Sequence, residues 1–214
     1  MEVVGIDVGS RRLDAVALDG EGRVLGTAVF PAGDVEGLVA WVESAADVAV
    51  DAPDTWSTAP HVGDDGLAPK FRSARCAEIG LGRTEGIWVP WTTPVEGTPG
   101  TWIAVGVHLF AALRDAGHHP LEVFPHATFR VLADGRRPPK KQTVDGARAR
   151  TALLQAAGVS SPAMGSWGHD ARDAASAALV ALQHTGGTAR PVTCGHDRSA
   201  IWLPARPSGS ETTG

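Results

Sequence analysis

Apolar positions in the first fifty residues predict a series of strands interrupted by one helix. The pattern indicates strands at residues 2–8, 13–19, 23–30 and 47–51. The turn from Gly20 to Gly22 joins the second and third of these strands as a hairpin. A helix is expected over about 35–45, where Asp34 is placed to cap the first turn.

The regular pattern is interrupted between residues 52 and 100, where the chain is rich in Pro, Gly, Thr and Trp. We interpret this segment as a long insertion with one helix near residues 70–80. Beyond it, the pattern predicts helices over 101–116, 143–157 and 169–184, and a fifth strand over 120–124. Residues 206–214 are expected to form a disordered tail.

This order of elements predicts an α/β fold in a single domain over residues 1–205. We expect a five-stranded mixed sheet in the order 3-2-1-4-5, flanked by helices, with the first strand beside the fourth. A chain of 214 residues is long enough to bury one core and leaves little room for two lobes.

Composition and charge limit the possible functions. Hydrophobic residues make up 43% of the chain and charged residues 20%, and no apolar run reaches the ~20 residues that span a bilayer. The net charge of −5 argues against the broad basic surface of a sequence-blind nucleic-acid binder. No signal-peptide pattern precedes the first strand, so we expect a cytoplasmic location, with Cys76 and Cys194 as free thiols.

Acidic residues stand at the ends of three predicted elements. Asp7 ends the first strand, and Asp51 ends the fourth, which is its neighbour in the predicted sheet. Asp170 and Asp173 share one face of the last helix and can point toward the same centre. Buried carboxylates are costly unless a cation meets them, and Mg²⁺ and Mn²⁺ prefer such oxygen ligands. We therefore expect these acids to hold Mg²⁺ or Mn²⁺, two of which can promote phosphodiester cleavage.

Each of these acids also has a simpler interpretation. Asp7 could only shape the glycine turn that follows it, and Asp51 could be a loop acid. Asp170 and Asp173 could stabilise the helix N-terminus through its dipole. Glu122, inside the fifth strand, is a further candidate catalytic acid, although pairing with a buried arginine is the favoured interpretation.

Five segments of the chain, in a fixed order, carry a resemblance to a known family. The segments are Gly5–Gly9, Val48–Pro53, Glu122–Ala127, Lys140 and Lys141 ahead of Gly146–Arg148, and His169–Ala174. Through them the chain resembles the ribonuclease H-like superfamily and, within it, the predicted nucleases of domain of unknown function 429. The last segment is also similar to the acidic helix of Holliday-junction resolvases. The resemblance implies a metal-dependent phosphodiesterase with Asp7, Asp51 and Asp170 or Asp173 as metal ligands.

Nucleic acid is the partner that this resemblance implies. The basic residues predicted to contact phosphate are Arg72, Arg75, Lys140 and Lys141, and the alternative is that they lie on solvated surfaces. Trp88, Trp91 and Trp102 lie around a Pro/Thr-rich segment and could stack on bases. A homodimer is a further expectation, because junction-cutting members of the superfamily commonly pair.

Three functions remain open at this point. A metal-dependent nuclease is the function that the acids favour. A ribonuclease H-like binding module that has lost its chemistry is compatible with the low basicity. An actin-like ATP-dependent kinase would share the opening Asp-x-Gly-Ser turn, but the chain has no second phosphate-binding copy of that turn.

Overall fold

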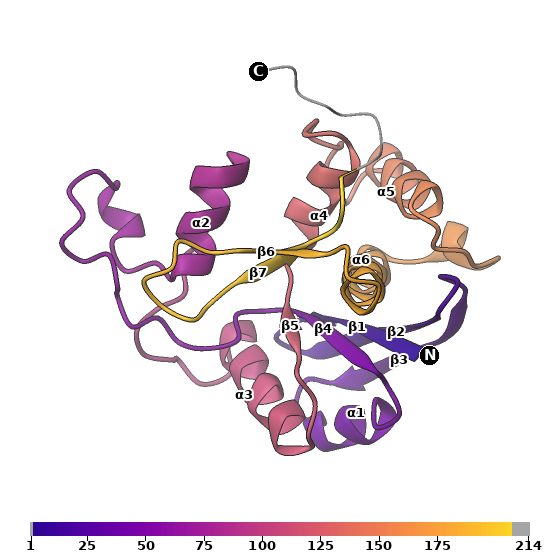
Figure 1. Ribbon diagram of the computed structural model, residues 1–214. Coiled ribbons are helices and arrows are strands. Elements are labelled where there is room, and N and C mark those ends of the chain that lie inside the picture. The colour runs from indigo at the N-terminus through magenta and orange to yellow at the C-terminus, as the bar shows by residue number, and fades with distance from the viewer. Residues whose placement is uncertain (1, 207–214) are drawn as a thin grey trace.

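The computed structural model describes residues 2–206 and contains a five-stranded sheet with helices on both faces (Figure 1). Its strands are β1 (Glu2–Val8), β2 (Arg12–Asp19), β3 (Val24–Pro31), β4 (Asp47–Asp51) and β5 (Leu121–Glu122). Strands β1 to β3 are antiparallel, and β4 and β5 run parallel to β1. The order is β3-β2-β1-β4-β5, so the predicted α/β fold with a mixed 3-2-1-4-5 sheet is confirmed.

Helices on the two faces divide the core into two layers. The helices of residues 2–206 are α1 (Val35–Trp41), α2 (Cys76–Glu85), α3 (Trp102–Asp115), α4 (Pro125–Leu132), α5 (Val144–Ala156) and α6 (His169–Thr185). Helices α1 and α3 cover one face of the sheet, and α6 crosses the other (Figure 1). Val3 of β1 packs on the α6 side and Ile6 on the opposite side, so strand alternation places Asp7 on the α6 side.

Helix α6 lies directly on the sheet at Gly5. A Cβ atom at this position would lie 2.0 Å from the backbone nitrogen of Ala178 and 2.1 Å from the backbone oxygen of Ala174. The missing side chain of Gly5 and the small side chains of α6 therefore let the helix backbone approach β1 closely. This close approach holds the first turn of α6 near the carboxyl ends of β1 and β4.

The segment between β4 and α3 packs with the end of the chain. A 3₁₀ turn at Pro69–Phe71 precedes α2, so the helix predicted near 70–80 begins only at Cys76. Apolar side chains of this segment share a third hydrophobic cluster with α4 and with a hairpin of β6 (Arg190–Val192) and β7 (Ile201–Leu203). The segment predicted as an insertion thus packs in a core that it shares with α4 and the C-terminal hairpin.

Three local predictions are corrected by the structure. The fifth strand ends at Glu122 rather than at 124 because Pro125 begins α4, a helix that the pattern did not predict. Helix α1 ends at Trp41 rather than at 45, since the chain must turn before β4 begins. Cys76 and Cys194 are joined as a disulfide, so the prediction of free thiols is wrong. These cysteines are 118 residues apart, and only the folded chain brings them together.

The predicted tail lies outside the described residues except for Arg206, which pairs with Glu85 of α2 at 3.0 Å. No helix between residues 2 and 206 combines the length and the apolar character needed to cross a membrane.

Candidate metal centre

Strand pairing places three carboxylates side by side on the α6 face of the sheet. Asp7 of β1 is the direct partner of Asp14 on β2 and of Asp51 on β4. Residues directly opposite one another in neighbouring strands project to the same face. Asp14, Asp7 and Asp51 therefore form a row across the three central strands.

The first two turns of α6 add two more acids to this row. A carboxylate oxygen of Asp170 lies within 4.8 Å of oxygens of Asp7 and Asp14. Asp173 is 3% exposed, and its charge raises the pKa values of both Asp7 and Asp51. The structure thus brings together the four acids predicted as ligands, along with Asp14. We call these five residues the acidic cluster.

Asp14 was not predicted as a site residue. In the sequence it is one polar residue in an alternating strand, and alternation alone does not say what lies beside it. The available signal was the hairpin register, because a turn that pairs Val8 with Leu13 must also pair Asp7 with Asp14.

Two basic side chains partly neutralise the acidic cluster. Lys141 Nζ lies 2.6 Å from Asp173 Oδ2. Arg12 Nε lies 2.8 Å from Asp14 Oδ2, and another nitrogen of the same guanidinium pairs with Asp170. Within residues 2–206, neither Asp7 nor Asp51 forms an ion pair. Among the described residues, two permanently charged side chains therefore form ion pairs with the five carboxylates, and the charge of Arg150 also acts on Asp173.

Burial and crowding oppose full ionisation of the acidic cluster. Burial, followed by the charges of Asp173 and Asp170, raises the pKa of Asp7 from its usual 3.8 to about 7. Burial likewise raises the pKa of Asp51, with further contributions from Asp7 and Asp173. The pKa of Asp173 is also raised by burial, although Lys141 acts in the opposite direction. A divalent cation would relieve this repulsion, and an all-carboxylate set is the kind that Mg²⁺ and Mn²⁺ prefer.

Two clefts open onto the acidic cluster. The larger has a volume of about 820 Å³, and its lining includes Asp51 and Asp173. The smaller has a volume of about 340 Å³, and its lining includes Asp7, Asp51 and Asp170. Because both clefts also share Lys141, a ligand could extend from one to the other across the acids.

Aromatic side chains line part of both clefts. Trp91 borders each of them, and its ring centroid lies 4.7 Å from that of Trp102 and 6.0 Å from that of Phe124. Trp88 borders the larger cleft and is 43% exposed. The tryptophans predicted to stack on bases thus lie beside the acidic cluster.

Basic side chains line another part of the larger cleft. They are Arg130, Arg137, Lys140, Lys141 and Arg150. This set contains the predicted phosphate contacts Lys140 and Lys141. Arg72 lines neither cleft and instead pairs with Asp65 at 3.1 Å. Of the residues predicted to contact phosphate, Lys140 and Lys141 thus line the larger cleft, and Arg72 lies outside both clefts.

The second half of the chain matches a known family model over residues 98–197, described as "Protein of unknown function (DUF429)". Over this region the chain is similar to the DUF429 family. The matched region contains Lys141 and the acids of α6, whereas β1 and β4 lie outside it. No curated protein matches the chain.

Several solved structures are similar to this chain. Thermus thermophilus RuvC is 18% identical with a TM-score of 0.45, and the match covers 87% of this chain and 97% of RuvC. T. thermophilus RuvC in complex with Holliday junction substrate is 19% identical with a TM-score of 0.43 and the same coverage. A putative sugar kinase from Cytophaga hutchinsonii is 14% identical with a TM-score of 0.32, covering 62% of this chain and 38% of the kinase. The ribonuclease H-like fold of this chain is evident from the order and directions of its own five strands.

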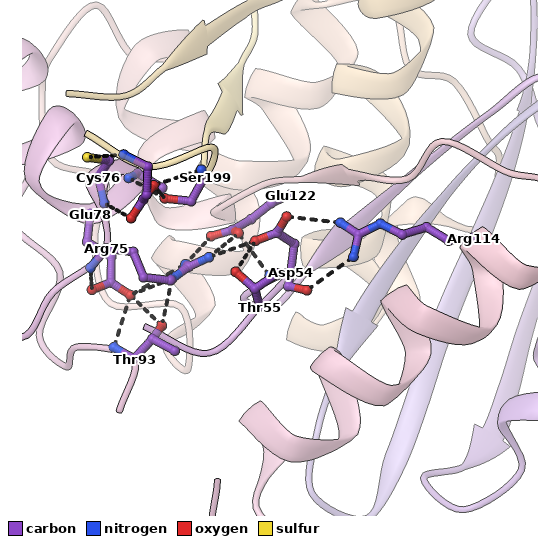
Figure 2. Close-up of polar contacts among 11 residues, drawn as sticks. Asp54, Thr55, Arg75, Cys76, Glu78, Thr93, Arg114, Glu122 and Ser199 are labelled. Carbon is purple, nitrogen blue, oxygen red and sulfur yellow. Dashed lines mark hydrogen bonds and ion pairs between the residues drawn. The ribbon is translucent and has the colours of Figure 1, made fainter. Parts of the chain in front are cut away.

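Arg75 and Glu122 belong to a buried network beside the clefts (Figure 2). Arg75 is 1% exposed, and its terminal nitrogens lie 2.7 and 2.6 Å from the two carboxylate oxygens of Glu122. Burial acts to lower the pKa of Arg75, but ion pairs with Glu122, Glu78 and Asp54 outweigh burial and raise it. The arginine leaves no exposed donor for a phosphate, and both oxygens of Glu122 are occupied. Neither residue is therefore retained as part of the site, and Arg75 is the buried arginine expected to pair with Glu122.

Proposed function

We propose that this protein is a metal-dependent nuclease that hydrolyses nucleic-acid phosphodiester bonds. The observation that carries the proposal is the convergence of Asp7, Asp51 and Asp173, from β1, β4 and α6, where an aromatic-lined cleft meets a basic one. These three residues are far apart in the sequence, and their convergence is costly unless a cation joins them.

The donor set of the acidic cluster fits Mg²⁺ or Mn²⁺. It offers carboxylate oxygens only. Burial and then the charges of Asp173 and Asp170 raise the pKa of Asp7 to about 7, and no residue within 2–206 forms an ion pair with Asp7. Hard divalent ions prefer such oxygens and bind through a few carboxylates while keeping several waters. Asp7 would be the central ligand, with Asp51 and Asp173 on one side and Asp14 and Asp170 on the other.

When bound, the metal ions would supply an activated water and stabilise the leaving oxygen. The chain's own side chains would position the substrate. Lys140 and Arg137 would hold phosphates along the larger cleft, and Trp91 and Trp102 would stack on bases beside the acids. Lys141, which pairs with Asp173 in the structure, is placed to steady the phosphate next to the scissile bond.

A cleavage assay with matched variants tests the proposal. The purified protein is incubated with single-stranded DNA, duplex DNA, RNA and a four-way junction, each with Mg²⁺, with Mn²⁺ or with EDTA. We expect cleavage of at least one substrate with metal and none with EDTA. Asp7→Asn should lose this cleavage, whereas Asp115→Asn, at an exposed position in α3, should keep it. Full activity of Asp7→Asn would remove the acidic cluster from the reaction.

The second candidate function is a nucleic-acid-binding module without chemistry. Lys141 and Arg12 favour it, because their ion pairs neutralise part of the acidic cluster without a metal. Such a module would bind oligonucleotides equally well with Mg²⁺ and with EDTA and would cut none of them.

Calorimetric titration with ATP tests the kinase alternative. The cytoplasmic location and the homodimer stay predictions.

A further inference from the structure

A second group of metal-binding side chains lies outside the acidic cluster. His61, Cys76, Cys194 and His196 each offer one ligand atom, and these four atoms all lie within 4.8 Å of one another. We propose that, with the two cysteines reduced, these residues hold one zinc ion in a structural Cys₂His₂ site. We call them the Cys/His cluster.

The spacing of the nitrogen and sulfur atoms suits tetrahedral coordination. His61 Nε2 lies 3.6 Å from Cys76 Sγ and 3.2 Å from Cys194 Sγ, and His196 Nδ1 lies 3.4 Å from Cys194 Sγ. Zinc bonds of about 2.0–2.3 Å at tetrahedral angles place ligand atoms roughly 3.3–3.8 Å apart. Both imidazole rings therefore already stand close to the distances that a shared ion requires.

The surroundings of Cys76 suit a thiolate. The backbone N–H groups of His196 and Asp197 donate to Cys76 Sγ at 3.0 and 3.2 Å. Cys76 is also the first residue of α2, where the helix dipole favours negative charge. The Asp197 carboxylate accepts from the Cys76 backbone N–H at 3.0 Å and from Ser199 Oγ at 2.6 Å, which fixes the chain around the sulfur (Figure 2). Donors of this kind orient metal-bound thiolates.

The disulfide between Cys76 and Cys194 and the zinc site are alternative states of the same two sulfurs. A disulfide explains the approach of the sulfurs, but it gives no reason for two imidazole nitrogens to converge on them. The reduced pair would bind zinc with the release of two thiol protons. Transfer of two electrons from the bound thiolates to hydrogen peroxide, which takes up two protons and becomes water, would form the disulfide and release the ion.

The Cys/His cluster joins segments that are distant in the sequence. His61 lies in the segment after β4, Cys76 begins α2, and Cys194 and His196 follow β6. The same segments share the third hydrophobic cluster, which lies apart from the two cores of the central sheet. Four protein ligands leave no open position for a substrate, so the ion would be structural.

Metal analysis of variants separates zinc from a disulfide. The full-length protein is purified with a phosphine reductant and zinc, and its metal content is measured by mass spectrometry. We expect one zinc per chain in the wild type and in His119→Ala, an exposed control. His196→Ala removes an exposed ligand but leaves both cysteines intact, so a disulfide would be unaffected. Loss of an outer-shell partner lowers metal affinity by about 10–100-fold. The zinc affinity of His196→Ala should fall further than this, because the variant loses a direct ligand.

Cobalt provides a readout that does not depend on any variant folding. Titration of the reduced wild type with Co²⁺ should give the thiolate charge-transfer band and the intense visible bands of a tetrahedral site, saturating at one equivalent. Peroxide should abolish these bands as the disulfide forms. Asp7→Asn should retain both zinc and the cobalt spectrum, so failure of the nuclease proposal would not affect this result. Reduced wild-type protein that binds neither ion, or a His196→Ala variant with unchanged zinc affinity, would overturn the proposal.

Discussion

Asp7→Asn should stabilise the metal-free protein even though it removes the proposed central metal ligand. In the folded chain, burial and then the charges of Asp173 and Asp170 raise the pKa of Asp7 from 3.8 to about 7. Between these values the folded state binds the proton more tightly than the unfolded state. The free energy of unfolding must therefore fall as the pH rises from about 4 to about 7, and the loss is complete above that range.

The size of the effect follows from the same shift. Each pKa unit corresponds to about 1.4 kcal/mol, so the shift costs on the order of 4 kcal/mol at about pH 8, where folded Asp7 is ionised. At about pH 5, where Asp7 takes up a proton on folding, it costs about 2 kcal/mol. Asparagine is neutral at both pH values and avoids this cost. The variant should accordingly gain up to ~4 kcal/mol over the wild type at about pH 8, and roughly half of that at about pH 5.

Urea unfolding in EDTA at both pH values measures the difference, with Asp115→Asn as the matched control at an exposed position. The control should change the unfolding free energy by less than ~0.5 kcal/mol at either pH. Mn²⁺ at 100 times its Kd stabilises the wild type by about 2.7 kcal/mol, so it should reverse the order at about pH 5 and narrow the difference at about pH 8. The electrostatic reasoning would be refuted if Asp7→Asn were less stable than the wild type at about pH 8. It would also be refuted if the difference in unfolding free energy between the two proteins were the same at both pH values.

Three further changes probe other parts of the structure. Gly5→Ala should destabilise the protein by several kcal/mol in urea unfolding, because its Cβ would lie 2.0 Å from the backbone nitrogen of Ala178. A Cβ at Gly20 meets nothing within 4 Å, so Gly20→Ala is the control. Equal losses of stability in the two variants would contradict the close approach of α6. Arg75→Met should cost about 3–5 kcal/mol by leaving Glu122 buried without its partner, and a change below ~1 kcal/mol would show that the network is weak. Trp91→Ala should weaken binding of a single-stranded oligonucleotide by about 1–3 kcal/mol in fluorescence anisotropy while leaving Mn²⁺ affinity unchanged; unaltered oligonucleotide binding would exclude stacking.

Local sequence patterns were sufficient for most of the elements and for the central part of the acidic cluster. Alternation and turns located β1 to β4, and the hairpin connection placed the first strand beside the fourth. Asp7 and Asp51 could be predicted as neighbours because both end strands that are adjacent in this order. Asp173 could be added because helical periodicity gives it and Asp170 a common face.

Long-range contacts decided the residues that the sequence assigned differently or missed. Arg75 was predicted to bind phosphate, but it pairs with Glu122, which is 47 residues away. Asp14 required the exact register of β2 against β1. The Cys/His cluster gave no signal in the sequence, because His61 and Cys194 are 133 residues apart.

The sequence by itself therefore determined most of the strands and helices and the acids that end them, since periodicity and capping depend on residues a few positions apart. Only the tertiary structure decided which charges meet in the interior. A buried ion pair or ligand set forms where separate elements pack together, and the distance along the chain between its members carries no information about that packing.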